Sequence, residues 1–282
     1  MLLHGWAGGV IGFYERNRMN PYLTAPVYHL DGGRLKPGED TLAEEAPVAL
    51  VYNGISHVVL MSTPQDLAEL AVGFSLSEGI AQHIGQLYDV DVQAVCEGWS
   101  VQIELAASQF TALKERRRNI SGRSGCGLCG IDSLAAAMPV LPVLNGRQPI
   151  ALGDVDAVLA MLEHSQPLRR LTGALHSAAW VEEGEIKALF EDIGRHNALD
   201  KLLGHLARNQ YDMQKGWLLV SSRASYEMVA KAVMLGIGCL VAVSAPTALS
   251  VRMAEQSNMT LIGFARPGRQ TVYTHPEYLK AE

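Results

Sequence analysis

The chain has 282 residues, and 48% of them are hydrophobic, which is enough for one large buried core or two modest ones. Its net charge of −6, from 23 basic and 29 acidic residues, gives no general attraction to nucleic acid or to an anionic membrane surface. No apolar run approaches the roughly 20 residues of a membrane-spanning helix. The apolar N-terminus has no Lys or Arg before Arg16 and no clear cleavage site, so it makes a poor signal peptide. We therefore expect a globular, cytoplasmic protein.

The first half of the chain favours β-hairpins. Residues 1–24 have no strong periodicity and are expected to form a loose extension, which leaves residues 25–135 as the N-terminal region proper. Two strand-like runs between residues 47 and 61 are joined by Asn53-Gly54, a strong signal for a two-residue hairpin turn. Two more such runs lie between residues 90 and 106. The pattern predicts a small, hairpin-rich part.

One helix is expected between these hairpins and another after them. Thr63 and Pro64 suit the N-cap and the first position of a helix, which would then run towards Glu78. The polar residues 108–118 predict a second, short helix that leads into a cysteine-containing segment.

Isolated cysteines and histidines in this pattern point to packing. Cys96 and Cys239 each lie in an apolar run, so we expect them in the core and not in a disulfide framework. His57 and His83 are expected to be partly buried and hydrogen-bonded, and not to be metal ligands.

Residues 136–282 change to alternating helices and strands. A helix is predicted over residues 154–163 and a hairpin around Glu183-Gly184. The predicted elements beyond it are helix 195–208, strand 216–222, helix 225–235, strand 239–244, helix 247–257, strand 260–266 and strand 271–275. Such alternation predicts an α/β layer structure with adjacent parallel strands.

The segment from Arg116 to Gly130 concentrates unusual chemistry. It holds Cys126 and Cys129, each flanked by glycine, so a mobile loop is expected there. Arginines surround the loop's start, and residues 131–138 read as a capped helix start. Positive charge and helix-end N–H groups would both favour the thiolate form of the cysteines. The pair is therefore a candidate for sulfur chemistry.

Three other readings of this pair stay open from the residues alone. A structural zinc site usually needs about four Cys or His ligands, whereas the pair supplies two, so we expect no metal. A thioredoxin-like pair for disulfide exchange would be expected after a strand in a βαβ unit. The third reading is a passive glycine-rich loop beside a solvated, arginine-rich helix face.

Residues suited to anions follow several of the C-terminal strands. In α/β sheets, ligands collect beyond the carboxyl ends of the strands, where helices begin. The candidate residues at these positions are Arg195, His196, Ser222, Arg223, Thr247, Phe264, Ala265, Arg266, Pro267, Gly268 and Arg269. Several such clusters on one sheet edge would suit a multi-phosphate ligand. A generic dehydrogenase or kinase is disfavoured, because neither G-x-G-x-x-G after a strand nor G-x-x-x-x-G-K-[ST] occurs.

Six stretches together resemble a known family. They are G-C-G-L-C-G (125–130), T-G-A-L-H-S-A-A (172–179), E-D-I-G-R-H-N-A-L-D-K (191–201), S-S-R-A-S-Y-E-M-V (221–229), S-A-P-T-A-L-S-V (244–251) and N-M-T-L-I-G-F-A-R (258–266). In combination they are similar to the formate dehydrogenase accessory sulfurtransferases of the FdhD family. The similarity covers most of the chain after Gly122 and is weak before residue 40.

The resemblance implies a fold and a function. The fold would be a cytidine-deaminase-like, three-layer α/β sandwich with a mixed sheet, beside the smaller hairpin-rich N-terminal part. The function would be that of a cytoplasmic homodimer that takes sulfur from a cysteine desulfurase. It would deliver this sulfur to the molybdenum (or tungsten) bis(molybdopterin guanine dinucleotide) cofactor of the formate dehydrogenase catalytic subunit. By position, Cys126 matches the persulfide-forming cysteine, Cys129 its partner, and Phe264 to Arg269 the cofactor-binding segment; guanosine diphosphate (GDP) would mimic part of the cofactor.

Two rival functions follow from the same features. A zinc nucleobase deaminase needs H-x-E followed downstream by P-C-x-x-C. Here His176-Ser177-Ala178 lacks the glutamate and the C-x-x-C lies upstream, which disfavours that chemistry. A cofactor-binding chaperone without a covalent step stays open, because its anion sites would look the same. Only the role of the cysteines separates the chaperone from the sulfurtransferase.

Overall fold

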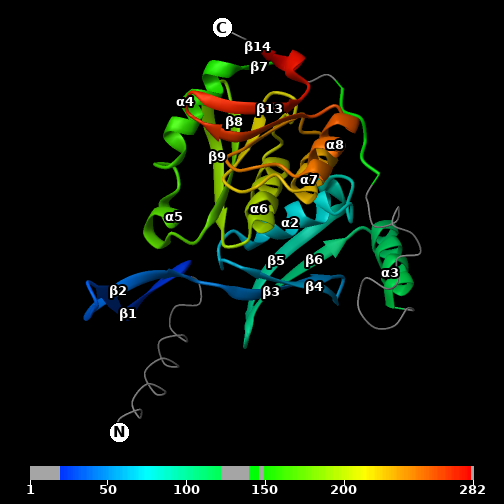
Figure 1. Cartoon of the computed structure of the whole chain (residues 1–282). Coiled ribbons are helices and arrows are strands. Elements are labelled where there is room, and N and C mark those ends of the chain that lie inside the picture. Colours follow the sequence, from blue (N-terminus) through cyan, green and yellow to red (C-terminus); the bar gives the residue numbers. More distant parts are fainter. Residues whose placement is uncertain (1–19, 122–139, 146–148, 281–282) are drawn as a thin grey trace.

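The structure, a computed structural model, describes residues 20–121, 140–145 and 149–280. The described chain forms two packed parts and one projecting β-ribbon (Figure 1). One part is a six-stranded sheet with helices on both faces, and the other is a four-stranded sheet backed by a helix. None of the described helices is long and apolar enough to cross a membrane. Cys126 and Cys129 lie outside the described residues.

The six-stranded sheet is mixed and has the order β13-β12-β11-β10-β8-β9. Its strands are β8 (His176–Glu182), β9 (Glu185–Asp192), β10 (Trp217–Val220), β11 (Cys239–Ala242), β12 (Thr260–Arg266) and β13 (Arg269–Thr274). Strands β10, β11 and β12 are parallel, while β8, β9 and β13 pair antiparallel with their neighbours. The predicted hairpin, the predicted alternation and the mixed sheet are confirmed.

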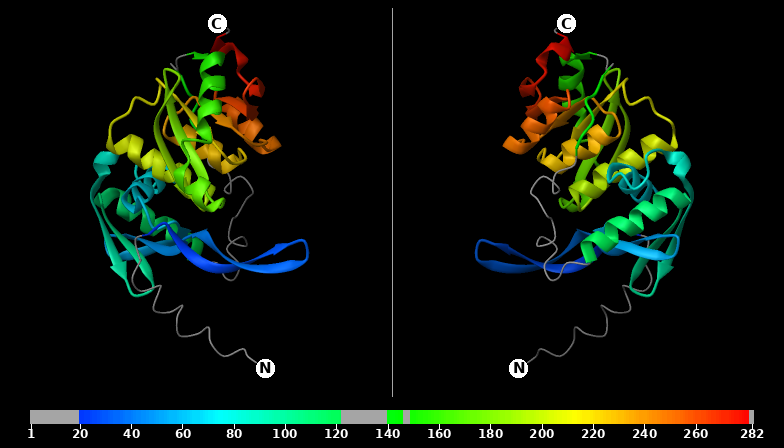
Figure 2. Two further views of the ribbon diagram at one scale, coloured as in Figure 1. Left: turned by 90° about the vertical axis from the view of Figure 1, so that its left-hand side faces the viewer. Right: turned by 90° about the vertical axis from the view of Figure 1, so that its right-hand side faces the viewer.

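Helices cover both faces of this sheet and give the predicted three layers (Figures 1 and 2). One face carries α6 (Arg195–Arg208), α7 (Tyr226–Met234) and α8 (Ala248–Gln256), and the other carries α4 (Leu152–Leu162). Strand residues alternate between the two faces. Trp180 and Leu218 pack on the α6 side, whereas Ala179 and Leu219 pack on the α4 side, and all four are at most 1% exposed. The sheet is therefore buried on both faces.

The four-stranded sheet is built from the two predicted hairpins. Its strands are β3 (Ala46–Tyr52), β4 (Ile55–Ser62), β5 (Leu87–Val95) and β6 (Gly98–Leu105), in the order β4-β3-β6-β5. Val48, Leu50 and Tyr52 of β3 are fully buried in the same core cluster as the apolar side chains of α2 (Leu67–Ser77). Helix α3 (Ala107–Ser121) follows β6 and adds Leu113 to this core.

Helix α2 begins later than predicted. The structure starts it at Leu67, after Asp66 in a left-handed conformation with φ 54°, and not at Pro64. Thr63 does not cap this helix, because its side chain is used elsewhere: Oγ1 accepts a hydrogen bond from the backbone N–H of Ile193 at 3.3 Å. The expected cap is instead a contact between the two halves of the chain.

The projecting ribbon was not predicted. It consists of β1 (Tyr22–Asp31) and β2 (Arg34–Ala43), so it begins inside the segment that was expected to be a loose extension. The ribbon extends away from the body in both views of Figure 2. Tyr28, Leu30 and Leu35 lie on one face of it and are 68%, 72% and 68% exposed. The prediction failed because a proline interrupts each strand-like run, which normally argues against a strand.

Two residue-level predictions are corrected by burial. Cys96 is exposed because it follows β5 directly, in the turn to β6, where the chain leaves the core. Cys239 is buried, as predicted. His83 is exposed where the chain enters a short 3₁₀ turn, whereas His57 is partly buried as predicted.

Candidate functional site

The predicted anion-binding positions meet at one edge of the six-stranded sheet. Strand β9 is antiparallel to β8, and β8 is antiparallel to β10, so β9 ends at the same edge as β10, β11 and β12. Backbone hydrogen bonds link the segments that follow these strands. Ser244 N–H donates to the carbonyl of Ser222 at 3.4 Å, and Phe264 N–H donates to the carbonyl of Ser244 at 3.1 Å. The candidate residues thus belong to one connected rim.

The N-terminus of α6 holds the protein's own carboxylate. Asp192 Oδ1 accepts hydrogen bonds from Gly194 N–H at 2.7 Å and from Asn197 Nδ2 at 3.1 Å. Its Oδ2 accepts from Ser62 Oγ at 2.6 Å and lies 2.7 Å from Lys201 Nζ. The side chains of Asp192 and Lys201 are completely buried. Asp192 therefore places a carboxylate of the protein at this helix start, and its bonds join the two parts of the fold.

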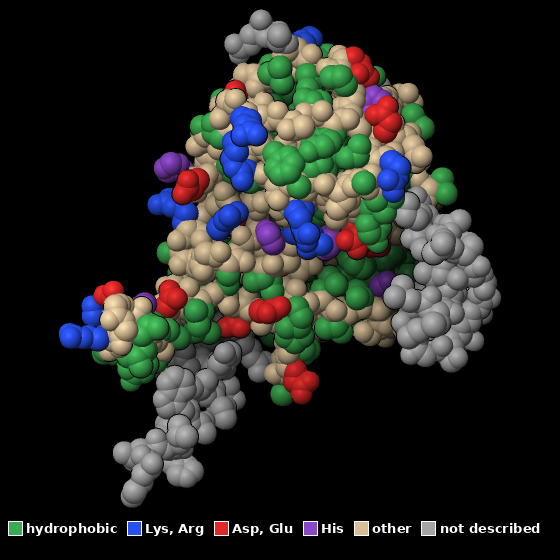
Figure 3. Space-filling model, viewed as in Figure 1, with side chains coloured by type: hydrophobic (Ala, Val, Ile, Leu, Met, Phe, Trp, Pro, Cys, Tyr) green, Lys and Arg blue, Asp and Glu red, His purple; other side chains and the backbone are tan. Residues whose placement is uncertain are grey.

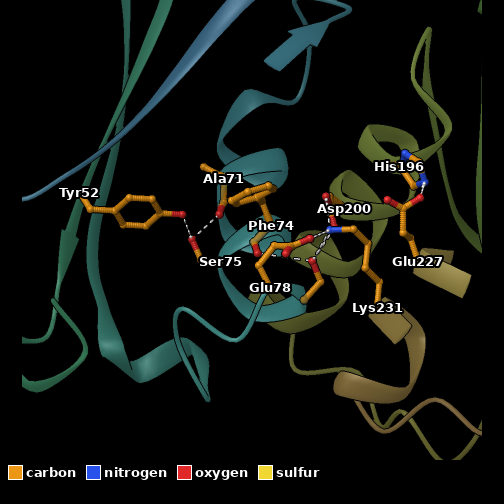
Figure 4. Close-up of polar contacts among 10 residues, drawn as sticks. Tyr52, Ala71, Phe74, Ser75, Glu78, His196, Asp200, Glu227 and Lys231 are labelled. Carbon is orange, nitrogen blue, oxygen red and sulfur yellow. Dashed lines mark hydrogen bonds and ion pairs between the residues drawn. The ribbon is translucent and has the colours of Figure 1, made fainter. Parts of the chain in front are cut away.

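A second buried network lies where helix α2 of the N-terminal part packs against α6 and α7, a region called the junction below (Figure 4). Lys231 Nζ donates to Asp200 Oδ2 at 3.0 Å, to Ser77 Oγ at 2.9 Å and to Glu78 Oε1 at 2.7 Å. Burial alone would lower the pKa of Lys231, but the carboxylates of Asp200 and Glu78 outweigh it and raise that pKa. The network connects α2, α6 and α7 and keeps every charge paired.

Two glycines bring α2 and α6 into backbone contact. A Cβ atom on Gly73 would lie 1.7 Å from the carbonyl oxygen of Asp200, and one on Gly204 would lie 2.0 Å from that of Glu69. No side chain fits at these distances. The junction is therefore specified by shape as well as by charge.

A pocket of about 430 Å³ opens between α4, helix α5 (Pro167–Thr172) and the strand ends. Its polar lining residues are Glu163, Gln166, Arg169, Arg170, Ser221 and Arg266. Ala265 and Pro267, which belong to the predicted segment, also line it. The volume is in the range of small-molecule sites, and three arginines suit an anionic ligand.

Arg169 and Arg170 are the site residues that sequence reasoning missed. They stand in the run Q-P-L-R-R, with Pro167 at the first position of α5. The available signal was a proline that starts a helix, with two adjacent arginines just before the T-G-A-L-H-S stretch. The run does not follow a strand, so the rule that ligands collect beyond strand ends does not select it.

The turn after β12 is held against α4. Gly268 N–H donates to Asp156 Oδ1 at 2.9 Å, and Gln270 Nε2 donates to the same oxygen. Arg266 is exposed, and its Nη1 donates to the carbonyls of Val243 and, at 2.8 Å, of Ala265. Its guanidinium is therefore positioned at the pocket and still faces solvent.

Phe264 is strained and exposed. Its φ of 51° is in the left-handed region, which is unfavourable for an aromatic residue, and 51% of its surface is accessible. Strain of this kind persists where the surroundings enforce it, and here Gly263 packs so closely on Pro246 that an added Cβ would lie 2.6 Å from the proline ring. The fold thus presents an aromatic ring at the rim.

A histidine and a glutamate connect the starts of α6 and α7. His196 Nε2 lies 2.9 Å from Glu227 Oε2, and burial lowers the pKa of His196 although Glu227 opposes this. Among the described residues, Arg195 Nε and Ser225 Oγ are buried without a hydrogen-bond partner. These two groups are neighbours of the pair in sequence and can still bind a ligand or water.

Positive charge is concentrated near the start of β8. Burial lowers the pKa of His176, and the nearby cations Arg169 and Arg195 lower it further. Figure 3 shows several basic side chains and histidines across the middle of one face of the molecule. The local potential is therefore positive although the whole chain is acidic.

The other predicted contact residues are used by the fold itself. Ser222 is buried and its Oγ donates to the carbonyl of Arg223 at 3.0 Å. Thr247 Oγ1 accepts from Ser250 N–H at 3.2 Å, which caps α8. Arg223 is exposed. None of these three lines the arginine pocket, and their contact with a cofactor stays a prediction.

Within residues 20–121, 140–145 and 149–280, no three His, Cys, Asp or Glu side chains are grouped closely enough to hold a metal ion. The polar groups that line the described pocket are three arginines, a hydroxyl, an amide and one carboxylate.

Comparison with known proteins agrees with this architecture. The crystal structure of a protein from Desulfotalea psychrophila, described as a putative formate dehydrogenase accessory protein, superimposes with a TM-score of 0.72. The two sequences are 20% identical, and the match covers 93% of this chain and 100% of that one, so the fold is shared. A sequence model of the FdhD/NarQ family matches residues 43–280. Because that match spans both packed parts of the fold and the arginine pocket, the chain belongs to the FdhD/NarQ family.

Proposed function

We propose that this protein matures formate dehydrogenase by carrying sulfur from a cysteine desulfurase to the enzyme's bis(molybdopterin guanine dinucleotide) cofactor. Family membership, and the fold shared with a formate dehydrogenase accessory protein, support a role in formate dehydrogenase maturation. In this proposal the protein acts in the cytoplasm as a homodimer, and the cofactor with its metal is cargo.

The observation that carries the proposal is the arginine pocket at the sheet edge. Arg169, Arg170 and Arg266 line it together with one carboxylate, Glu163, and within the described residues none of the three arginines forms an ion pair. Charges that face solvent in this way suit the phosphates of a dinucleotide. The exposed ring of Phe264 lies at the same edge of the sheet, although it is not among the residues that line the pocket, and it is suited to stack on a guanine base.

The sulfur step is assigned to Cys126. Its thiolate attacks the outer sulfur of a persulfide on the desulfurase cysteine, and a new S–S bond forms at Cys126. The desulfurase S–S bond breaks, and its electron pair leaves on the desulfurase cysteine as thiolate. One sulfur atom has then moved without a net change in oxidation state. The pocket would hold the acceptor cofactor while the sulfur is passed on.

Substitution of the carrier tests the covalent step. Cys126→Ala is expected to abolish activation of formate dehydrogenase, while Cys96→Ala, at an exposed cysteine in the turn after β5, is expected to leave it unchanged. After incubation with desulfurase and cysteine, the intact mass of the wild-type protein should increase by one sulfur atom that a reductant removes. A fully active Cys126→Ala protein would refute the carrier function and favour the non-covalent chaperone.

The two cysteines of the loop can be separated by mapping. We assign the persulfide to Cys126, which the resemblance favours, and an assisting role to Cys129. Peptide mapping of the persulfidated single variants should find the sulfur in Cys129→Ala and not in Cys126→Ala. The opposite result would reverse the assignment.

Cofactor binding is expected to be independent of the cysteines. GDP binding, measured by calorimetry, should survive Cys126→Ala/Cys129→Ala, because the pocket arginines come from α5 and the end of β12. Loss of binding in that variant would make the cysteine loop part of the nucleotide pocket.

A further inference from the structure

Glu191 is a buried carboxylate that has no role in the proposal above. It belongs to β9 and is 7% exposed. Its Oε2 accepts a hydrogen bond from Leu168 N–H at 2.9 Å, and its Oε1 accepts from Arg169 N–H at 2.8 Å. These N–H groups lie in the first turn of α5, directly after Pro167, which has none. One carboxylate thus caps the N-terminus of α5 with both oxygens.

Helix α5 depends on such external bonds. It has six residues, and a helix of that length is not stable by itself. Gln166, which is 4% exposed, supports it from the other side: its Oε1 accepts from Arg169 Nη1 at 3.3 Å and from Ser177 Oγ at 3.1 Å. Both the backbone and the side chain of Arg169 are therefore fixed by buried groups.

Glu191 and the arginines lie on different sides of α5. Pro167, Leu168 and Glu191 line a smaller pocket of about 290 Å³, while Arg169 and Arg170 line the anion pocket, and Glu191 is not among the lining residues of the latter. A carboxylate would repel a phosphate that it faced, but this one is directed at two backbone N–H groups at the positive end of a helix. Its effect on a ligand must pass through the helix.

We propose that Glu191 is a positioning residue that holds Arg169 and Arg170 at the phosphate-binding side of the pocket. The proposal rests on the proposed function, because it assumes that the pocket binds the cofactor's phosphates. Without the carboxylate, two N–H groups lose their partner and the short helix loses its anchor. The arginines then remain in the chain but are no longer preorganised for a ligand.

The test is a mutant cycle on GDP binding, measured by calorimetry at low and high salt. Arg169→Ala/Arg170→Ala is expected to weaken binding by at least about ten-fold, because it removes two charged hydrogen-bond donors from the pocket. Glu191→Ala should weaken it to a similar extent and reduce its salt dependence. Adding Glu191→Ala to the arginine variant should change affinity by less than about two-fold, because both changes remove the same interaction.

Two further variants keep the result interpretable. Glu191→Gln retains one acceptor oxygen, is expected to fold, and should give an intermediate loss. Glu185→Gln removes a carboxylate at the other end of β9, where it pairs with Lys187 at 2.6 Å, and should bind GDP like the unmodified protein.

Two results would overturn the inference alone: unchanged affinity in both Glu191 variants while the arginine variant is weakened, or losses that multiply in the combined variant. If the unmodified protein, or the arginine variant, shows that GDP does not use this pocket, the proposed ligand site fails and the inference fails with it.

Discussion

The junction between α2 and α6 and the arginine pocket use charge in opposite ways. In the junction, Asp192 and Lys201 lie 2.7 Å apart and are completely buried, and each has further hydrogen-bond partners. At the pocket, Arg169 and Arg170 are exposed. A buried charge is tolerated only when it is paired, whereas a charge that is to meet a ligand must be left accessible. The difference separates residues that hold the fold from residues that can bind.

Residues 191–201 contain both predicted anion ligands and buried residues that hold the fold together. The stretch E-D-I-G-R-H-N-A-L-D-K contains Arg195 and His196, which the sequence predicts to be anion ligands, yet Asp192, Asn197, Asp200 and Lys201 in it are all buried. They pair with residues of the N-terminal part, with Lys231 or with one another. Polar residues at a strand end therefore indicate either a ligand or a neighbouring element, and only the structure distinguishes the two.

Breaking the shape of the junction should have the largest effect. Gly73→Val would place a side chain where a Cβ already meets the carbonyl of Asp200 at 1.7 Å. We expect the free energy of unfolding to fall by about 4 kcal/mol or more, or the variant not to fold, as measured by urea denaturation. Gly85→Ala is the control, because it is exposed and a Cβ there would meet only the ring of His83 at 3.2 Å. Near-normal stability of Gly73→Val would mean that the helices are not in backbone contact.

Breaking the charge pairing of the junction should be the next largest effect. Lys201→Met leaves Asp192 buried without its cation, which typically costs about 3–5 kcal/mol. The double variant Asp192→Asn/Lys201→Met should recover part of that loss, because no charge is then left unpaired. Urea denaturation of the wild-type protein and of these two variants measures this, and a double variant less stable than Lys201→Met would contradict it.

The pocket should show the reverse behaviour. Arg170→Ala/Arg266→Ala is expected to change the free energy of unfolding by no more than about 0.5 kcal/mol, because both side chains are exposed. The same variant should bind GDP about ten-fold more weakly. Calorimetry and urea denaturation on the same sample check both parts. A large loss of stability would mean that these arginines stabilise the fold, as the buried charges of the junction do.

The smallest effect concerns pH. Burial and the nearby arginines lower the pKa of His176 below its ordinary value of about 6.5. Between the two pKa values the unfolded chain binds more protons than the folded one, so stability falls as the pH is lowered below about 6.5. His176→Gln should make this fall shallower, and His83→Gln, at an exposed position, should not. Identical slopes of unfolding free energy against pH in all three proteins would refute the assignment.

Local signals allowed much of the fold to be predicted. The turn at Asn53-Gly54 and the helix over residues 195–208 are where the sequence predicted them, because turn chemistry and periodicity act over a few residues. The ribbon was missed because Pro26 and Pro37 suppress the strand signal. The start of α2 was placed wrongly because Thr63 has its partner 130 residues further along the chain.

Three of the predicted cofactor-binding residues, Ala265, Arg266 and Pro267, line the pocket, and their contact with a ligand stays a prediction. Arg169 and Arg170 also line it, but they belong to α5, which comes before β8 in the sequence and does not follow a strand of the sheet. Thr247 caps its own helix, so its hydroxyl is already used by the fold. Whether a hydroxyl caps a helix or stays available for a ligand depends on packing, which no local sequence pattern encodes.

The residues that bond across the junction are far apart in the sequence, which has a consequence for synthesis on the ribosome. Ser62 is made 130 residues before Asp192, which accepts its hydrogen bond. At about 5–20 residues per second, roughly 6–26 seconds pass before the partner exists. During that time the Gly73 face of α2 has no α6 to pack against. The nascent N-terminal part therefore leaves this face of α2 uncovered until translation has passed α6.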